Sequence, residues 1–229
     1  MVEVEGAAST SREQDAVRIL LIIAASALPM SEPSSPDPAL ADAVGVVETQ
    51  VKLQKVDFWV RNPDYLAAML LKDYETSREP YLLELADEIL ASDEPEVRRY
   101  PMLRYLFGAY EPLDDALAVL RSAGLVIRRK RGTPGRVQQH DYFLTRRGRD
   151  AVDTILVTEP VFSYYVSRVN LVAALTEGHG GTQLKARQYL HDEYRHTPIG
   201  SRIGSIAQQT RERLAELQAE TVDGGGGNG

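Results

Sequence analysis

The sequence predicts a mainly α-helical protein with one small antiparallel β-hairpin, an α+β fold. Through most of its 229 residues, apolar side chains recur at spacings of three and four, which is typical of amphipathic helices. One stretch departs from this pattern: apolar β-formers at residues 125–127 and aromatic and branched residues at 142–144 lie on either side of the turn-forming tetrapeptide 132–135. Because 43% of the residues are hydrophobic, the chain can bury a core as one large domain or two small ones.

Two helices are expected to flank the hairpin. The first contains Leu117 and Leu120 and ends at Gly124, because a glycine lets the chain turn out of a helix. The second follows Thr145, whose hydroxyl can cap a helix N-terminus. The predicted buried face of this second helix consists of Ala151, Val152, Ile155 and Leu156.

These elements follow one another as a helix, the segment AGLV, a basic turn, the segment YFLT and the segment RRGRDAV. The succession resembles the C-terminal half of the winged helix-turn-helix regulators of bacteria and archaea, as in the MarR, ArsR and PadR-like groups. The resemblance implies that the helix at residues 112–123 lies in the DNA major groove and that the wing at 128–136 contacts the backbone or the minor groove. It also implies a first helix at 82–90 and a short second helix at 102–107.

The helix breaks and the resemblance together divide the chain into five parts. We expect a disordered or mis-assigned leader at 1–38, N-terminal helices at 39–78, a winged-helix domain at 79–157, a C-terminal helical region at 158–220 and a disordered tail at 221–229.

The leader contains an apolar run at residues 19–25, which is too short to span a bilayer. The run could be the core of a signal peptide, an extension upstream of a true start at Met30, or a helix packed on the core. Acidic residues before the run disfavour a signal peptide, and the composition of residues 31–38 is that of an ordinary disordered N-terminus, which favours a start at Met30. Further along, the pattern becomes helical from residue 39, with apolar residues spaced to bury one side as far as Trp59, and Pro63 begins the next helix.

The last predicted helix carries a long, narrow apolar seam. It is expected to begin at Thr197, and its apolar positions recur at spacings of four and three. A helix of this kind after a winged-helix domain commonly pairs with its copy in a second subunit, which suits a two-fold DNA site. The alternative is that the C-terminal helices complete the core of a monomer. The seam consists of Ile199, Ile203, Ile206, Thr210, Leu214 and Leu217.

Positive charge is concentrated in the hairpin, although the whole chain has a net charge of -7. Residues 121–149 contain nine Arg or Lys and one acid, a net charge of +8, which leaves -15 for the rest. A basic stretch in an acidic chain is the pattern of a focused polyanion site, so the predicted partner is double-stranded DNA. Against this, Glu111, Asp114 and Asp115 at the start of the helix before the wing would face phosphates unfavourably. The predicted DNA-binding residues are Arg121, Arg128, Arg129, Lys130, Arg131, Arg136, Arg146 and Arg147.

The sequence offers little for catalysis, cofactors or metals. It has no cysteine, so disulfides, thiolate zinc sites and cysteine nucleophiles are excluded. His191 and His196 are five residues apart, about 140° around a helix, and would not share a face as a zinc pair does. No phosphate-loop, dinucleotide or nucleophile-elbow motif is found. We therefore expect a protein without enzymatic activity, cofactor or metal.

Together these observations predict a cytoplasmic, homodimeric transcription regulator of winged-helix type, with a basic wing that contacts DNA phosphates and no membrane partner. The alternative is a winged-helix adaptor, in which the acidic helix contacts protein and the basic hairpin meets an acidic partner. Salt-sensitive retention of duplex DNA would distinguish the first from the second.

Overall fold

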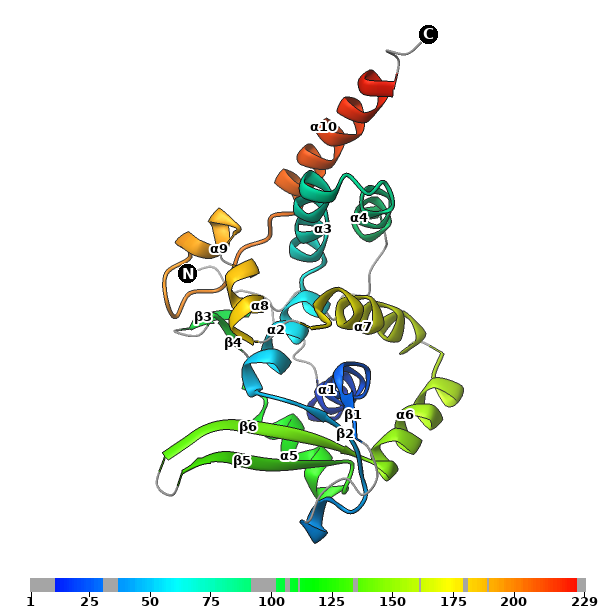
Figure 1. Ribbon diagram of the computed structural model, residues 1–229, viewed down its shortest axis with the longest axis vertical. Helices are drawn as coiled ribbons and strands as arrows, with labels where there is room; N and C mark the ends of the chain where they lie inside the picture. Colours follow the sequence, from blue (N-terminus) through cyan, green and yellow to red (C-terminus); the bar gives the residue numbers. More distant parts are fainter. Residues whose placement is uncertain are drawn as a thin grey trace, which may run out of the picture. The chain divides into compact units, whose positions relative to one another are not determined.

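The computed structural model divides the chain into two compact units, each built from two separate segments (Figure 1). Unit 1 comprises Met1–Leu53 and Pro112–Glu177, and unit 2 comprises Gln54–Glu111 and Gly178–Gly229. The winged-helix domain expected over residues 79–157 does not coincide with either unit. The structure describes residues 11–30, 37–91, 102–105, 108–110, 112–133, 136–160, 162–178, 181–188 and 190–225.

Unit 1 is centred on helix α1 (Arg12–Ser26), which packs against α5 (Asp114–Ser122), α6 (Arg146–Thr158) and α7 (Phe162–Thr176). A capping box at its N-terminus starts the helix, and its run of isoleucines and leucines is almost completely buried. The prediction of a disordered leader is therefore wrong for these residues, and the third interpretation, a helix packed on the core, describes them. A helix that is apolar on nearly all sides is buried on nearly all sides.

The sheet of unit 1 has the strand order β1-β2-β6-β5, with every neighbouring pair antiparallel. The prediction of a helical pattern from residue 39 to the break before Pro63 is wrong at residues 43–47, which form a strand, and is confirmed at residues 50–61, which form a helix. Burial alternates along that strand as a period of two requires, and short apolar runs fit a strand or a helix equally well in sequence. The strands are β1 (Leu28–Pro29), β2 (Ala43–Val47), β5 (Val126–Thr133) and β6 (Arg136–Thr145), and a short 3-10 helix, η1 (Pro38–Leu40), precedes β2.

Unit 2 is built on two helices that were both predicted, α3 (Pro63–Ser77) and α4 (Tyr81–Ala91), which pack against each other. The short helix expected at residues 102–107 is wrong, because this region forms an antiparallel strand pair; residues 106 and 107 lie outside the described part. The remaining elements are α2 (Gln50–Arg61), which contains the boundary between the units, β3 (Leu103–Tyr105), β4 (Gly108–Tyr110), α8 (Gly181–Gln188), α9 (Asp192–His196) and α10 (Ala207–Gly225).

The C-terminal helix α10 packs against α3 and α4 of its own chain. It begins at Ala207, ten residues later than expected, and extends into the predicted disordered tail as far as Gly225. Thr210, Leu214 and Leu217 of the predicted seam are 3%, 5% and 0% exposed. These three residues are thus covered within one chain, as in the alternative of a monomeric core, whereas Ile199 of the same seam is 58% exposed. No described helix is both long and apolar enough to cross a bilayer.

Candidate nucleic-acid interface

The base of the hairpin is fixed by hydrogen bonds around Thr145. Gly124 turns the chain out of α5 with a φ of 71°, a backbone conformation that favours glycine. The hydroxyl of Thr145 donates to the carbonyl oxygens of Gly124 and Leu125, at 2.8 and 3.0 Å, and accepts from the N–H of Gly148 at 3.0 Å. A Cβ on Gly148 would lie 2.3 Å from the carbonyl oxygen of Leu125, so α6 can approach this closely only because residue 148 is glycine.

The structure confirms the two strands of the predicted hairpin, whereas residues 134 and 135 of the predicted turn lie outside the described residues. β5 and β6 pair from Val126 with Leu144 to Thr133 with Arg136, with one irregularity near Gly132. Figure 1 shows them as two long green strands, and the described residues at their left end, Thr133 and Arg136, are exposed. Because side chains alternate along a strand, Arg128 and Lys130 share one face of the sheet, and the arginines that follow each of them share the other.

Arg128 is held by α5 rather than projecting into solvent. Its side chain is 22% exposed, its Nη1 lies 3.3 Å from Oδ1 of Asp114 at the start of α5, and its Nη2 lies 3.2 Å from Nε2 of His140. Partial burial lowers the pKa of His140, and the nearby charges of Arg128 and Lys130 lower it further. The imidazole is therefore neutral at pH 7 and can accept the hydrogen bond from the guanidinium group.

Arg129, on the opposite face, is also paired. Its Nε donates to Oδ2 of Asp37 at 3.1 Å. The pKa of Asp37 is lowered, first by the hydrogen bond from the backbone N–H of Ala39 and then by the Arg129 guanidinium. Asp37 is therefore ionised at neutral pH and neutralises this wing cation.

Arg131 has two acidic partners. Its Nε donates to Oδ2 of Asp141 at 2.9 Å, and its Nη2 lies 3.4 Å from Oε1 of Glu48. Asp141 is buried, and its Oδ1 accepts from Nε2 of Gln139 at 2.9 Å and from the N–H of Thr49 at 3.3 Å. This carboxylate links β6 to the chain that follows β2, so Arg131 stabilises the sheet as well as carrying charge.

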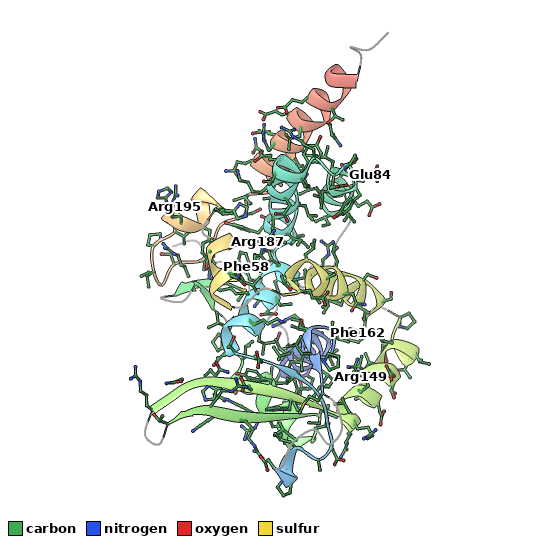
Figure 2. All side chains as sticks on the ribbon, in the orientation of Figure 1. Phe58, Glu84, Arg149, Phe162, Arg187 and Arg195 are labelled. Atoms are coloured by element: carbon green, nitrogen blue, oxygen red, sulfur yellow. The ribbon has the colours of Figure 1, made fainter. Side chains whose placement is uncertain are left out.

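The eight predicted site residues all lie in unit 1, but they do not form one continuous basic surface. Three of the five hairpin cations are matched with acids, whereas Lys130, opposite His140 midway along the hairpin, and Arg136, at its tip, form no ion pair with any described residue. At the base of the hairpin, Arg121 lies in the last turn of α5, and the exposed Arg147 lies in the first turn of α6. Arg146 beside it is exposed as well, and Figure 2 labels Arg149 on the same helix.

The exposed cations are thus divided between the outer part of the hairpin, up to Arg136 at the tip, and its base. Strand β6 separates these places by nine residue steps, or about 30 Å at roughly 3.3 Å per residue. The exposed face of α5 between them is acidic at its start, where Asp114 is 76% exposed and Asp115 is also exposed. The sequence could not indicate that Asp37 and Glu48 would pair with the wing, because they precede it by more than eighty residues.

Comparison of the chain with protein-family models, curated proteins and solved structures finds no match. Within the described part of the chain, no group of three or more His, Asp or Glu side chains is placed to hold a metal ion. A proposal of function therefore rests on the geometry of the hairpin and its flanking helices.

Proposed function

We propose that unit 1 is the winged-helix DNA-binding module of a transcription regulator, with the β5–β6 hairpin as its wing and α5 as the helix before the wing. The observation that carries the proposal is a hairpin that directly follows a helix in chain order and has two exposed cations, Lys130 and Arg136, without an ion pair among the described residues. Exposed cations on a protruding hairpin are suited to contact phosphates or a minor groove.

The ion pairs within the hairpin determine which of its cations gain binding free energy from contact with DNA phosphates. Lys130 and Arg136 would exchange only water and counterions for a phosphate, so each contact adds about 0.9 to the salt slope of binding. Arg128 and Arg129 would have to leave carboxylates at 3.3 and 3.1 Å, and their net gain is smaller. The tip and the base of the hairpin are about 30 Å apart, close to the roughly 34 Å of one DNA turn, so they suit separate backbone contacts.

Base contacts by α5 would come from its C-terminal half. Asp114 and Asp115 at the N-terminal end repel phosphates, whereas Arg121 is exposed at the other end and can donate to base edges. The Ser122 hydroxyl beside it donates to carbonyl oxygens of its own helix. This arrangement favours binding dominated by backbone contacts over strong sequence discrimination.

The test is a salt series of binding to random duplex DNA by three proteins: wild type, the double variant Lys130→Ala/Arg136→Ala, and the matched control Arg129→Ala. We expect the double variant to lose about 1.8 of the salt slope and the control to lose much less than 0.9. Equal slopes in all three would reject phosphate contacts by Lys130 and Arg136. Absence of wild-type binding at low salt would reject the DNA-binding proposal itself.

A second function, that of a protein-binding adaptor, is favoured by one observation: the exposed carboxylates of Asp114 and Asp115 on α5. They would meet a basic partner, while the tip of the hairpin would meet an acidic one. A partner that copurifies in the presence of nuclease and is lost on Asp115→Ala would support this function; copurification that nuclease abolishes would support DNA binding.

The proposal concerns a single chain. The seam residues that lie on α10, Thr210, Leu214 and Leu217, are already buried, and α10 packs against α3 and α4, whereas Ile199 of the expected seam is 58% exposed. A two-fold complex on DNA would need an interface outside the three buried residues.

A further inference from the structure

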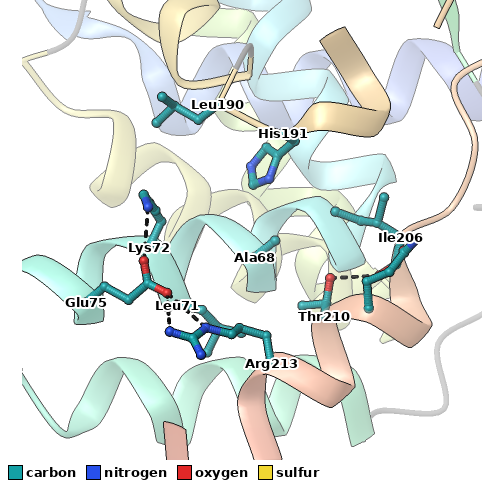
Figure 3. A pocket seen from close by; sticks show the side chains of 10 residues that line it. Ala68, Leu71, Lys72, Glu75, Leu190, His191, Ile206, Thr210 and Arg213 are labelled. Carbon is teal, nitrogen blue, oxygen red and sulfur yellow. Dashed lines mark hydrogen bonds and ion pairs between the residues drawn. The ribbon is translucent and has the colours of Figure 1, made fainter. Parts of the chain in front are cut away.

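Unit 2 contains a pocket of about 410 Å³ beside α3 and α10, shown in Figure 3. Its volume falls within the range of small-molecule sites, roughly 300 to 1,000 Å³. Since each water molecule takes about 30 Å³ in the liquid, the pocket has room for a ligand of about a dozen non-hydrogen atoms. All of its lining residues belong to unit 2.

One side of the pocket is apolar. Leu71 and Ile206 line it and are 2% and 7% exposed, whereas Leu190 at the rim is 60% exposed. An exposed leucine beside buried apolar side chains leaves hydrocarbon surface in water, and covering it would release about 25 cal/mol for each Å². The apolar body of a ligand would provide this cover.

The other side carries a charged triad. Oε2 of Glu75 accepts from Nζ of Lys72 at 3.0 Å, and its Oε1 accepts from Nε and Nη2 of Arg213 at 3.0 and 2.8 Å. The hydrogen bond from Lys72 is the largest effect that lowers the pKa of Glu75, and Arg213 lowers it further, so the carboxylate is ionised. Nη1 of Arg213 is also bound, to Oε2 of Glu216 at 2.8 Å.

Lys72 is therefore the cation with donors to spare. An ammonium group has three N–H donors, and Glu75 takes one of them. The Lys72 side chain is 58% exposed, and Figure 3 shows it extending toward Leu190 and His191. The ring of His191 is itself supported by an edge contact with Tyr65, at 5.6 Å between centroids.

From this arrangement we propose that the pocket binds a small amphipathic carboxylate. Its carboxylate would accept from the Lys72 ammonium, and its apolar body would lie on Leu71, Leu190 and Ile206. Arg213 is already paired with Glu75 and Glu216, so the ligand's carboxylate would bind through a charge-assisted hydrogen bond from Lys72 alone. The inference rests on unit 2 alone and is independent of DNA binding by unit 1.

The test is calorimetric titration of the full chain with 4-phenylbutyrate, which has a dozen non-hydrogen atoms, and with its primary amide, a neutral probe of the same shape. We expect the carboxylate to bind at least tenfold more tightly than the amide. Lys72→Met should reduce carboxylate binding to the level of the amide and leave amide binding unchanged. Leu190→Ser should weaken both probes.

Lys72→Arg separates the charge effect from collapse of the pocket, because it keeps a cation at the same place. It should retain the preference for the carboxylate even if Lys72→Met proves poorly folded by circular dichroism. Equal binding of the two probes, no binding of either at millimolar concentration, or a preference that Lys72→Arg abolishes would overturn the proposal.

Discussion

Truncation of a single isoleucine in α1 tests whether this helix belongs to the core of unit 1. Ile22 is completely buried in a helix that packs against α5, α6 and α7. Ile22→Ala removes three carbons, which corresponds to about 2.4 kcal/mol at roughly 0.8 kcal/mol each. The cavity left behind adds to this loss and relaxation of the neighbours reduces it, so we expect a total of about 2 to 4 kcal/mol. At about 4 °C per kcal/mol for a unit of this size, we expect its Tm to fall by roughly 8 to 16 °C.

The assay is thermal unfolding followed by circular dichroism, with hydrogen exchange of β6 peptides to assign the transition to unit 1. Val157→Ala is the matched control, because Val157 lies on α6 of the same unit and is 82% exposed. Its effect should stay within about 0.5 kcal/mol. If Ile22→Ala changes the Tm no more than Val157→Ala does, α1 is not part of the core and the disordered leader predicted from sequence is correct.

Three further predictions concern the hairpin. Gly148→Ala puts a Cβ 2.3 Å from a backbone oxygen, so the Tm of unit 1 should fall more than for Val157→Ala, and an unchanged Tm would refute the close approach. The pKa of His140 lies below its ordinary value near 6.5, so the unfolded chain binds more protons and the free energy of unfolding falls as the pH drops below about 6.5. His140→Gln should remove part of this loss, which urea unfolding at pH 5 and pH 8 would measure. The same pH dependence in the variant and the wild type would contradict this expectation. Asp37→Asn with Asp114→Asn frees two arginines and should raise the salt slope of DNA binding by up to about 1.8, whereas an unchanged slope would show that these arginines do not reach phosphates.

The hairpin and the helices on either side of it could be predicted because their signals are local. A glycine with a positive φ ends α5, and the Thr145 hydroxyl accepts from an amide within the first turn of α6. Alternation of side chains along β5 then places cations on both faces. Each of these signals involves residues fewer than ten positions apart, and nothing distant competes with them.

The start of the chain was predicted less well because its structure depends on distant partners. The strand β2 pairs with β6, about a hundred residues later, and α1 is buried by helices from the second segment of unit 1. An apolar run such as residues 19–25 shows that burial is needed but not which segment provides it. The signal that could have excluded disorder was the capping pair Ser11 and Gln14 just before the run.

The candidate site shows the same limit for charge. A run of four cations at residues 128–131 predicts a polyanion site only if the side chains are free, and three of them are matched with carboxylates. Two of those carboxylates come from segments more than eighty residues away. The net charge summed along a sequence therefore overestimates the electrostatic field that a partner meets. Lys130 and Arg136 carry most of the hairpin's positive charge that carboxylates do not neutralise.

The apolar seam of α10 shows the same limit for the prediction of assembly. Spacings of four and three correctly indicate that Thr210, Leu214 and Leu217 are buried, but they carry no information about which chain covers them. Burial releases a similar free energy in either case, whereas a partner in the same chain avoids the loss of translational and rotational freedom on association. α3 and α4 supply that cover here, so pairing through α10 would first have to displace them. Two copies that act together on DNA must therefore meet through surfaces outside the part of the seam that lies on α10.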